Sequence, residues 1–164
     1  MDLYIVRHAW AADRDAERWP NDDLRPLMPQ GIERFESVVK KIRKRGFEPG
    51  IIATSPLVRC RQTADVIARM MNDEVEVVEH DALQPGSNAV ELMQWTARQA
   101  REFQQVAWVG HAPDVGELTA ESVGEEAGQF RFAKGAIAAI RFDGLPELGE
   151  GELRWLVTAK VLGC

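Results

Sequence analysis

The chain has 164 residues, of which 45% are hydrophobic and 28% charged, and its formal net charge at pH 7 is −6. These values are typical of one soluble globular domain, and we expect a single domain over residues 1–164 that needs no disulfide or metal to fold. The negative charge argues against nucleic acid as a partner. No apolar run is long enough for a membrane span, and the opening MDLYIVRH lacks the features of a secretory signal. Two cysteines without metal-binding spacing favour reduced thiols and a cytoplasmic location.

Short apolar runs alternate with amphipathic stretches along the chain. We expect strands at residues 3–6, 51–53, 75–78, 106–109, 136–140 and 153–157. Pro29 is placed to open a helix that Gly46 stops, and Ser55 is placed to cap a second helix. Asn88 is placed to cap a third, and a short fourth helix begins near Pro113. Strands that alternate with helices predict an α/β fold with a largely parallel sheet.

Basic and imidazole side chains follow four consecutive strands of this expected sheet. In chain order the candidates are Arg7 and His8, then Ser55 and Arg59 in the next helix, then His80 and Asp81, and finally His111. Ligands of open α/β sheets bind beyond the carboxyl ends of the strands, so these groups are expected at one edge. A cluster of cations repels itself unless an anion lies among them, and a helix N-terminus adds N–H donors. The pattern therefore predicts a site for a phosphoryl group.

Five motifs carry a family resemblance: VRHA at 6–9, LRPLMPQG at 24–31, SPLVRCRQTA at 55–64, ALQPGSN at 82–88 and VGHAPDVGEL at 109–118. Their order and spacing resemble the histidine phosphatase superfamily, and within it the compact SixA-type phosphohistidine phosphatases. The resemblance implies a phosphoglycerate-mutase-like fold, a single-domain, three-layer α/β/α sandwich with helices on both faces of a mixed, mostly parallel sheet. The chain departs from the family pattern at Ala9, where Gly is usual, and at Met28, where Thr is usual. Neither departure removes a catalytic group.

The resemblance also implies a role for each of the main site residues. His8 would attack phosphorus and form a phosphohistidine intermediate, which water then hydrolyses. Arg7 and Arg59 would clamp the phosphoryl oxygens, and His111 would donate to one of them. The two guanidinium groups are expected to lower the pKa of His8 and so keep its imidazole neutral. No metal or cofactor is implied, because the two arginines supply the positive charge that a metal ion would otherwise supply to the phosphoryl oxygens.

Three further residues have alternative interpretations. Ser55 either offers its hydroxyl to the substrate or is a plain helix cap, and the second interpretation is favoured. Arg25 either reaches the rim of the phosphate site or makes a surface salt bridge. Asp81 is a candidate acid or water-orienting group, whereas its neighbour His80 is expected to face solvent.

Three functions remain open from the sequence. The first is a phosphatase acting on phosphohistidine in a protein, with a partner of the histidine phosphotransfer type. The second is a phosphomonoesterase for a small phosphorylated metabolite, with the same His8 chemistry. The third is a phospho-ligand binding module without turnover, which only Ala9 supports. A serine hydrolase is disfavoured because the chain has no GxSxG elbow, and a metallohydrolase because no His ligands are closely spaced.

The leaving group favours the first function. Larger members of the family carry an inserted segment with a Glu that protonates the departing oxygen, whereas here the segment HDALQPGSN is short and Ala82 stands near the expected position of that Glu. Once its distal nitrogen is protonated, imidazole leaves as a neutral ring whose conjugate acid has a pKa of about 6.5, whereas an alcohol resembles water, with a pKa of about 15.7. A site without a dedicated acid therefore suits phosphohistidine better than an alkyl phosphate.

Overall fold

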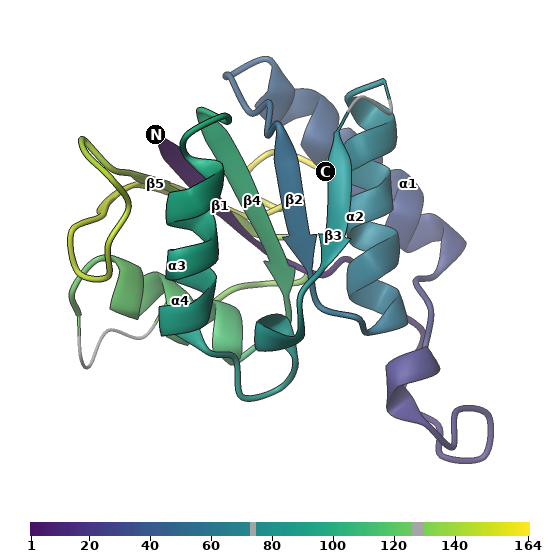
Figure 1. Ribbon diagram of the computed structural model, residues 1–164. Coiled ribbons are helices and arrows are strands. Elements are labelled where there is room, and N and C mark those ends of the chain that lie inside the picture. Colours follow the sequence, from purple (N-terminus) through teal and green to yellow (C-terminus); the bar gives the residue numbers. More distant parts are fainter. Residues whose placement is uncertain (73–74, 126–129) are drawn as a thin grey trace.

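The computed structural model describes residues 1–72, 75–125 and 130–164, and these form one sheet with helices on both faces (Figure 1). The sheet of the described residues has six strands in the order β3-β2-β4-β1-β5-β6. The strands are β1 (Asp2–Arg7), β2 (Ile51–Thr54), β3 (Glu76–Glu79), β4 (Gln105–Gly110), β5 (Ile137–Arg141) and β6 (Glu152–Val157). Each observed strand begins and ends within about one residue of the apolar run that predicted it.

Strand directions make the sheet mixed. β1, β2, β3 and β4 run parallel to one another, with β1 paired to β4, β4 to β2 and β2 to β3. β5 pairs antiparallel with β1, and β6 pairs antiparallel with β5. The expectation of a mixed, mostly parallel sheet is thus confirmed. Because β1, β2 and β4 are parallel neighbours, the residues that follow them emerge at the same edge.

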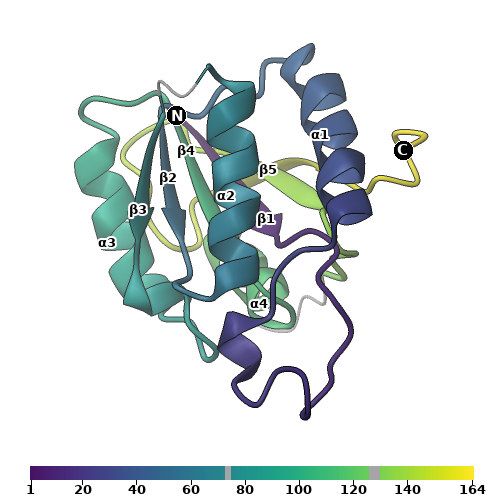
Figure 2. The same ribbon diagram turned by 90° about the vertical axis from the view of Figure 1, so that its right-hand side faces the viewer.

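Two pairs of helices cover the sheet. Helices α1 (Pro29–Arg43) and α2 (Val58–Met70) lie on one face, and α3 (Ala89–Gln99) and α4 (Asp114–Ser122) lie on the other (Figure 2). Apolar residues of each pair pack with alternate residues of the strands, which gives one buried cluster on each side of the sheet. This confirms the three-layer α/β/α sandwich. No helix in the described part of the chain combines the length and the apolar character that crossing a bilayer requires.

The helix starts follow the sequence signals at three places and depart from them at one. Pro29 begins α1, Asn88 caps α3 by accepting a hydrogen bond from the Glu91 N–H at 3.1 Å, and α4 begins directly after Pro113. The cap expected at Ser55 is wrong, because α2 begins only at Val58. The Ser55 N–H donates to the Val109 carbonyl at 2.9 Å, so Ser55 still continues β2 beside β4 and cannot yet turn into a helix.

A buried pair behind the site gives a test of the packing. Trp108 of β4 donates from its indole N–H to the Thr96 hydroxyl of α3 at 2.9 Å, and both side chains are fully buried. Thr96→Val removes the acceptor at nearly constant volume, so we expect a loss of about 1–3 kcal/mol in the free energy of unfolding, because the indole N–H is left unpaired. Thr96→Ser keeps the hydroxyl and should lose about 1 kcal/mol or less. Urea denaturation measures both, and a Val variant as stable as the Ser variant would contradict this assignment.

Candidate active site

One cavity of about 500 Å³, called the main cavity below, opens at the carboxyl edge of the parallel strands. The structure brings Arg7, His8, Arg59 and His111 together in its lining, from β1, the segment after β1, α2 and the segment after β4. The imidazoles and the Arg59 guanidinium are buried, whereas Arg7 is half-buried. The remaining lining residues are Ala12, Asp13, Arg14, Asp22, Asp23, Arg25, Leu57, Pro85, Ala112, Pro113, Asp114 and Lys134.

The His8 imidazole is held in one tautomer. Its Nδ1 lies 2.7 Å from the Ala9 carbonyl oxygen, and a carbonyl can only accept, so Nδ1 carries the hydrogen. Nε2 then carries the lone pair. Burial is the largest of the causes that lower the pKa of His8 to about 3; the positive charges of Arg59, Arg7 and Arg25 act in the same direction, and the hydrogen bond with Ala9 opposes them. The arginines act in the expected direction, but loss of solvation is the larger cause.

Two arginines place positive charge in the main cavity and bind loops outside their own elements. Arg7 donates from Nη1 to the Phe132 carbonyl at 2.6 Å, and Arg59 donates from Nη1 to the Asp22 carbonyl at 2.9 Å. Among the residues that the structure describes, the buried Nε atoms of Arg7 and Arg59 have no hydrogen-bond partner. Burial lowers the pKa of both groups. An anion in the main cavity would be attracted by both guanidinium groups, because both arginines line it.

The sequence did not single out Asp22, which is the carboxylate closest to this cluster. Its Oδ1 accepts from Arg25 Nε at 2.9 Å, and its Oδ2 lies 3.3 Å from Arg59 Nη2. The hydrogen bond from Arg25 holds the pKa of Asp22 below its usual value. Arg25 itself is buried and also donates to the Ala12 carbonyl at 2.7 Å. Arg25 thus lines the main cavity, and its ion pair with Asp22 is not the surface salt bridge of the second alternative, because the Arg25 side chain is buried.

His111 is fixed through both ring nitrogens. Nε2 lies 3.1 Å from the Leu83 carbonyl and so donates to it, and Nδ1 lies 3.4 Å from Asp114 Oδ2. The same carboxylate oxygen accepts from the Gly86 N–H at 2.9 Å and from the Ser87 hydroxyl at 3.3 Å. Burial lowers the pKa of His111, and Asp114 opposes that shift. Asp114 was also missed, although a carboxylate three residues after a histidine, at the start of a helix, is a recognisable signal.

Thr63 of α2 connects the segment that carries His8 to the helix that carries Arg59. Its hydroxyl accepts from the Ala9 N–H at 3.0 Å and donates to the Arg59 carbonyl at 2.7 Å. Ala9 is fully buried and does not have a positive φ, so a residue with a side chain fits where the family pattern has Gly. The substitution leaves the His8 imidazole in the main cavity.

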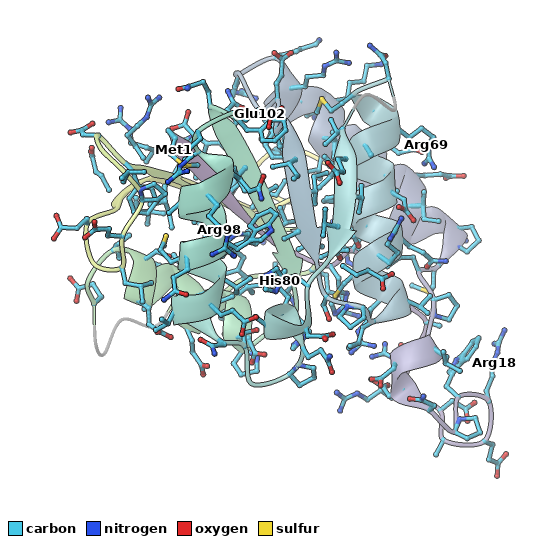
Figure 3. The ribbon with its side chains drawn as sticks, viewed as in Figure 1. Met1, Arg18, Arg69, His80, Arg98 and Glu102 are labelled. Atoms are coloured by element: carbon cyan, nitrogen blue, oxygen red, sulfur yellow. The ribbon has the colours of Figure 1, made fainter. Side chains whose placement is uncertain are left out.

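Three sequence candidates lie outside the main cavity. Ser55 is fully buried, and its hydroxyl accepts a long hydrogen bond of 3.4 Å from the Leu57 N–H. Asp81 is exposed and accepts from the Gln84 side chain at 2.8 Å. His80 packs edge-on against Trp95, with their ring centroids 5.8 Å apart (Figure 3). None of the three is among the residues that line the main cavity.

The chemistry available to the main cavity follows from these contacts. A neutral imidazole with a free Nε2 can attack an electrophile, and two buried guanidinium groups can bind the oxygens of an anion. Within residues 1–72, 75–125 and 130–164, no three His, Cys, Asp or Glu side chains are grouped so as to hold a metal ion.

Known proteins are similar to this chain in sequence and in fold. The family model of the histidine phosphatase superfamily (branch 1) matches residues 3–134. An uncharacterised protein of Picosynechococcus sp. is 32% identical over 86% of this chain and 85% of that protein. The phosphohistidine phosphatase SixA of Escherichia coli is 26% identical over 94% of this chain and 92% of that protein. A solved structure of the protein histidine phosphatase SixA, complexed with tungstate, has a TM-score of 0.83 at 25% identity and covers 99% of both chains.

The burial of His8 predicts how acid affects stability. The pKa of a histidine is about 6.5 in the unfolded chain, whereas that of folded His8 is about 3. Between these values the unfolded chain binds more protons, so His8 lowers the stability of the wild type as the pH falls below 6.5. His8→Gln lacks this group. We therefore expect the free energy of unfolding of His8→Gln, minus that of the wild type, to rise as the pH is lowered from 6 to 4. The rise should be up to about 1.4 kcal/mol per pH unit. Urea titrations at each pH measure this, and a constant difference would contradict it.

Proposed function

Because this chain belongs to the histidine phosphatase superfamily (branch 1) and is a phosphatase, we propose that it hydrolyses phosphohistidine carried by a protein, through a covalent intermediate on His8. The observation that carries the proposal is the His8 imidazole, whose Nε2 carries the lone pair and which lines the same cavity as the guanidinium groups of Arg7 and Arg59. That two similar proteins are named as histidine or phosphohistidine phosphatases supports the choice of substrate.

His8 acts as the nucleophile in this proposal. Its Nε2 attacks phosphorus, the bond from phosphorus to the leaving nitrogen breaks, and the phosphoryl group moves to His8; the leaving ring, protonated beforehand from solvent on its distal nitrogen, departs as neutral imidazole. Water then attacks the phosphohistidine, which releases inorganic phosphate and restores the imidazole. The low pKa of His8, about 3, keeps the lone pair available across the physiological range of pH.

The positive groups stabilise the phosphoryl oxygens. Arg7 and Arg59 bind them as charge shifts during the transfer. His111 can donate to them from Nδ1 only as an imidazolium, because its Nε2 hydrogen is already donated to the Leu83 carbonyl. The phosphoryl group competes with the Asp22 carboxylate, which lies 3.3 Å from Arg59 Nη2. Arg25 lies beside them, at the edge of the same cavity, and contributes further positive charge.

The leaving group supports phosphohistidine over an alkyl phosphate. Asp22 is held in its ionised form by Arg25, so it carries no proton to give to a departing alkoxide. Imidazole needs less help, because its conjugate acid has a pKa of about 6.5. Asp81 stays in this proposal only as a group that orients water or substrate from outside the main cavity, where it is exposed.

The intermediate can be trapped. Rapid quenching of the enzyme with labelled phosphoramidate should leave label on the protein that is lost in acid and kept in alkali, as for a phosphorus–nitrogen bond. His8→Ala should abolish the label and lower kcat by about 100-fold or more, because the nucleophile is lost. His80→Ala, which removes an imidazole outside the main cavity, is the matched control and should retain both. Turnover by His8→Ala at the wild-type rate would exclude His8 as the nucleophile.

A substrate panel tests the class of leaving group. We expect kcat/KM for protein-bound phosphohistidine and for phosphoramidate to exceed the values for phosphoserine and a sugar phosphate. The opposite preference, together with its loss in Asp81→Asn, would replace this proposal with a metabolite phosphomonoesterase in which Asp81 supplies the proton. Tight binding of phosphorylated ligands without turnover of any of them would identify a binding module instead.

A further inference from the structure

A second cavity adjoins the main cavity. It has a volume of about 470 Å³, and the two cavities share Arg7, Ala112 and Pro113 in their linings. The other residues around it are Gly116, Glu117, Phe130, Arg131 and Phe132. We call it the aromatic cavity, after its two phenylalanines. Arg7, which would bind the phosphoryl group in the main cavity, therefore also lines the aromatic cavity.

Two backbone contacts hold the aromatic residues in place. A Cβ atom on Gly116 would lie 2.4 Å from the Phe130 carbonyl oxygen, so α4 approaches this segment as closely as only glycine allows. At the other end of the segment, the Phe132 carbonyl accepts the 2.6 Å hydrogen bond from Arg7. Phe130 and Phe132 therefore lie beside the main cavity because of contacts made by their own backbone.

The two linings differ in chemistry. The main cavity is lined mostly by charged residues, whereas the lining of the aromatic cavity includes two phenylalanines, Phe130 and the buried Phe132, beside the exposed residues Glu117 and Arg131. A phosphate ester or phosphoramidate likewise has two parts that differ in charge, because its charged phosphoryl group is joined by one bond to an uncharged leaving group. A planar aromatic group packs favourably against phenylalanine rings, whereas a phosphate does not.

A third cavity competes for the same part of the substrate but fits it less well. It meets the main cavity at Ala12 and Asp13, and its lining also includes Asp15, Arg18 and Trp19. The boundary with this third cavity thus carries the Asp13 carboxylate, which repels a phosphoryl group, whereas the boundary with the aromatic cavity carries the cationic Arg7, which attracts it.

We propose that the aromatic cavity is the binding site for the leaving group, and that it selects a planar aromatic one, such as the imidazole ring of a phosphohistidine. The proposal deepens the proposed function and rests on it for the identity of the head group. The ring lies between Phe130 and Arg7, while the phosphoryl group lies against Arg59 and His8. A substrate with a small leaving group, such as ammonia, leaves this cavity empty.

Binding of two phosphonates tests the cavity without requiring any turnover. Phenylphosphonate and methylphosphonate carry the same anionic head and differ only in the ring. By isothermal titration calorimetry we expect the wild type to bind phenylphosphonate about 5- to 10-fold more tightly, as one well-placed aromatic contact provides. Phe130→Ala should lose this preference and bind methylphosphonate as the wild type does. Phe130→Leu keeps apolar volume and should show an intermediate preference, and it serves as the test if the alanine variant does not fold.

Trp19→Ala is the matched control, because it removes an aromatic side chain from the competing cavity. It should keep the full preference for phenylphosphonate. A preference lost in Trp19→Ala and kept in Phe130→Ala would overturn the proposal, as would equal binding of both phosphonates by the wild type. Failure of the proposed function would appear differently, as an absence of hydrolysis in the substrate panel while the selective binding of phenylphosphonate persists.

Discussion

Burial of two guanidinium groups at the carboxyl edge of the sheet governs the arrangement of everything around the main cavity. Removing such a cation from water is costly unless it finds acceptors, and each arginine finds its acceptors on a distant loop. Arg7 reaches the Phe132 carbonyl, 125 residues along the chain, and Arg59 reaches the carbonyl and carboxylate of Asp22, 37 residues away. The groups that bind the phosphoryl oxygens in the proposed function therefore also make long-range contacts with the loops beside the site. The loops that border the site depend on the charges within it.

Asp22 gives the site two alternative sets of ion pairs. In the structure described here, Asp22 balances part of the charge of Arg59 and Arg25. A phosphoryl group brings up to two negative charges and more acceptor oxygens than one carboxylate, so it can replace Asp22 at Arg59 while Arg25 retains its partner. The 3-10 turn of residues 22–24 lies on the long segment between β1 and α1 (Figure 1), and none of its three residues is buried. An exchange of ion pairs at this position costs little packing.

Local patterns in the sequence were sufficient for the elements and for the histidines. Strand runs, Pro29 and Asn88 act on near neighbours, and a parallel sheet brings the ends of β1 and β4 together, so His8 and His111 could be placed at one edge. Asp22 and Phe132 could not be found in this way, because their contacts with the arginines depend on how distant loops fold back. Ser55 shows the opposite failure. Its sequence signal for a helix cap is good, but its N–H is used by the neighbouring strand β4, and tertiary pairing prevails over the local preference.

The Thr63 hydroxyl accepts from the Ala9 N–H and donates to the Arg59 carbonyl, so one oxygen atom joins the start of the nucleophile segment to the backbone of the clamp. His8 is also held by the sheet, because its N–H donates to the Gly110 carbonyl at 2.9 Å and its carbonyl accepts from the Gly135 N–H at 3.1 Å. A shift of α2 along the sheet would therefore stretch the two hydrogen bonds of Thr63. In mechanical terms the hydroxyl is a tie between two layers, and it opposes sliding of the helix that carries the clamp over the sheet that carries the nucleophile.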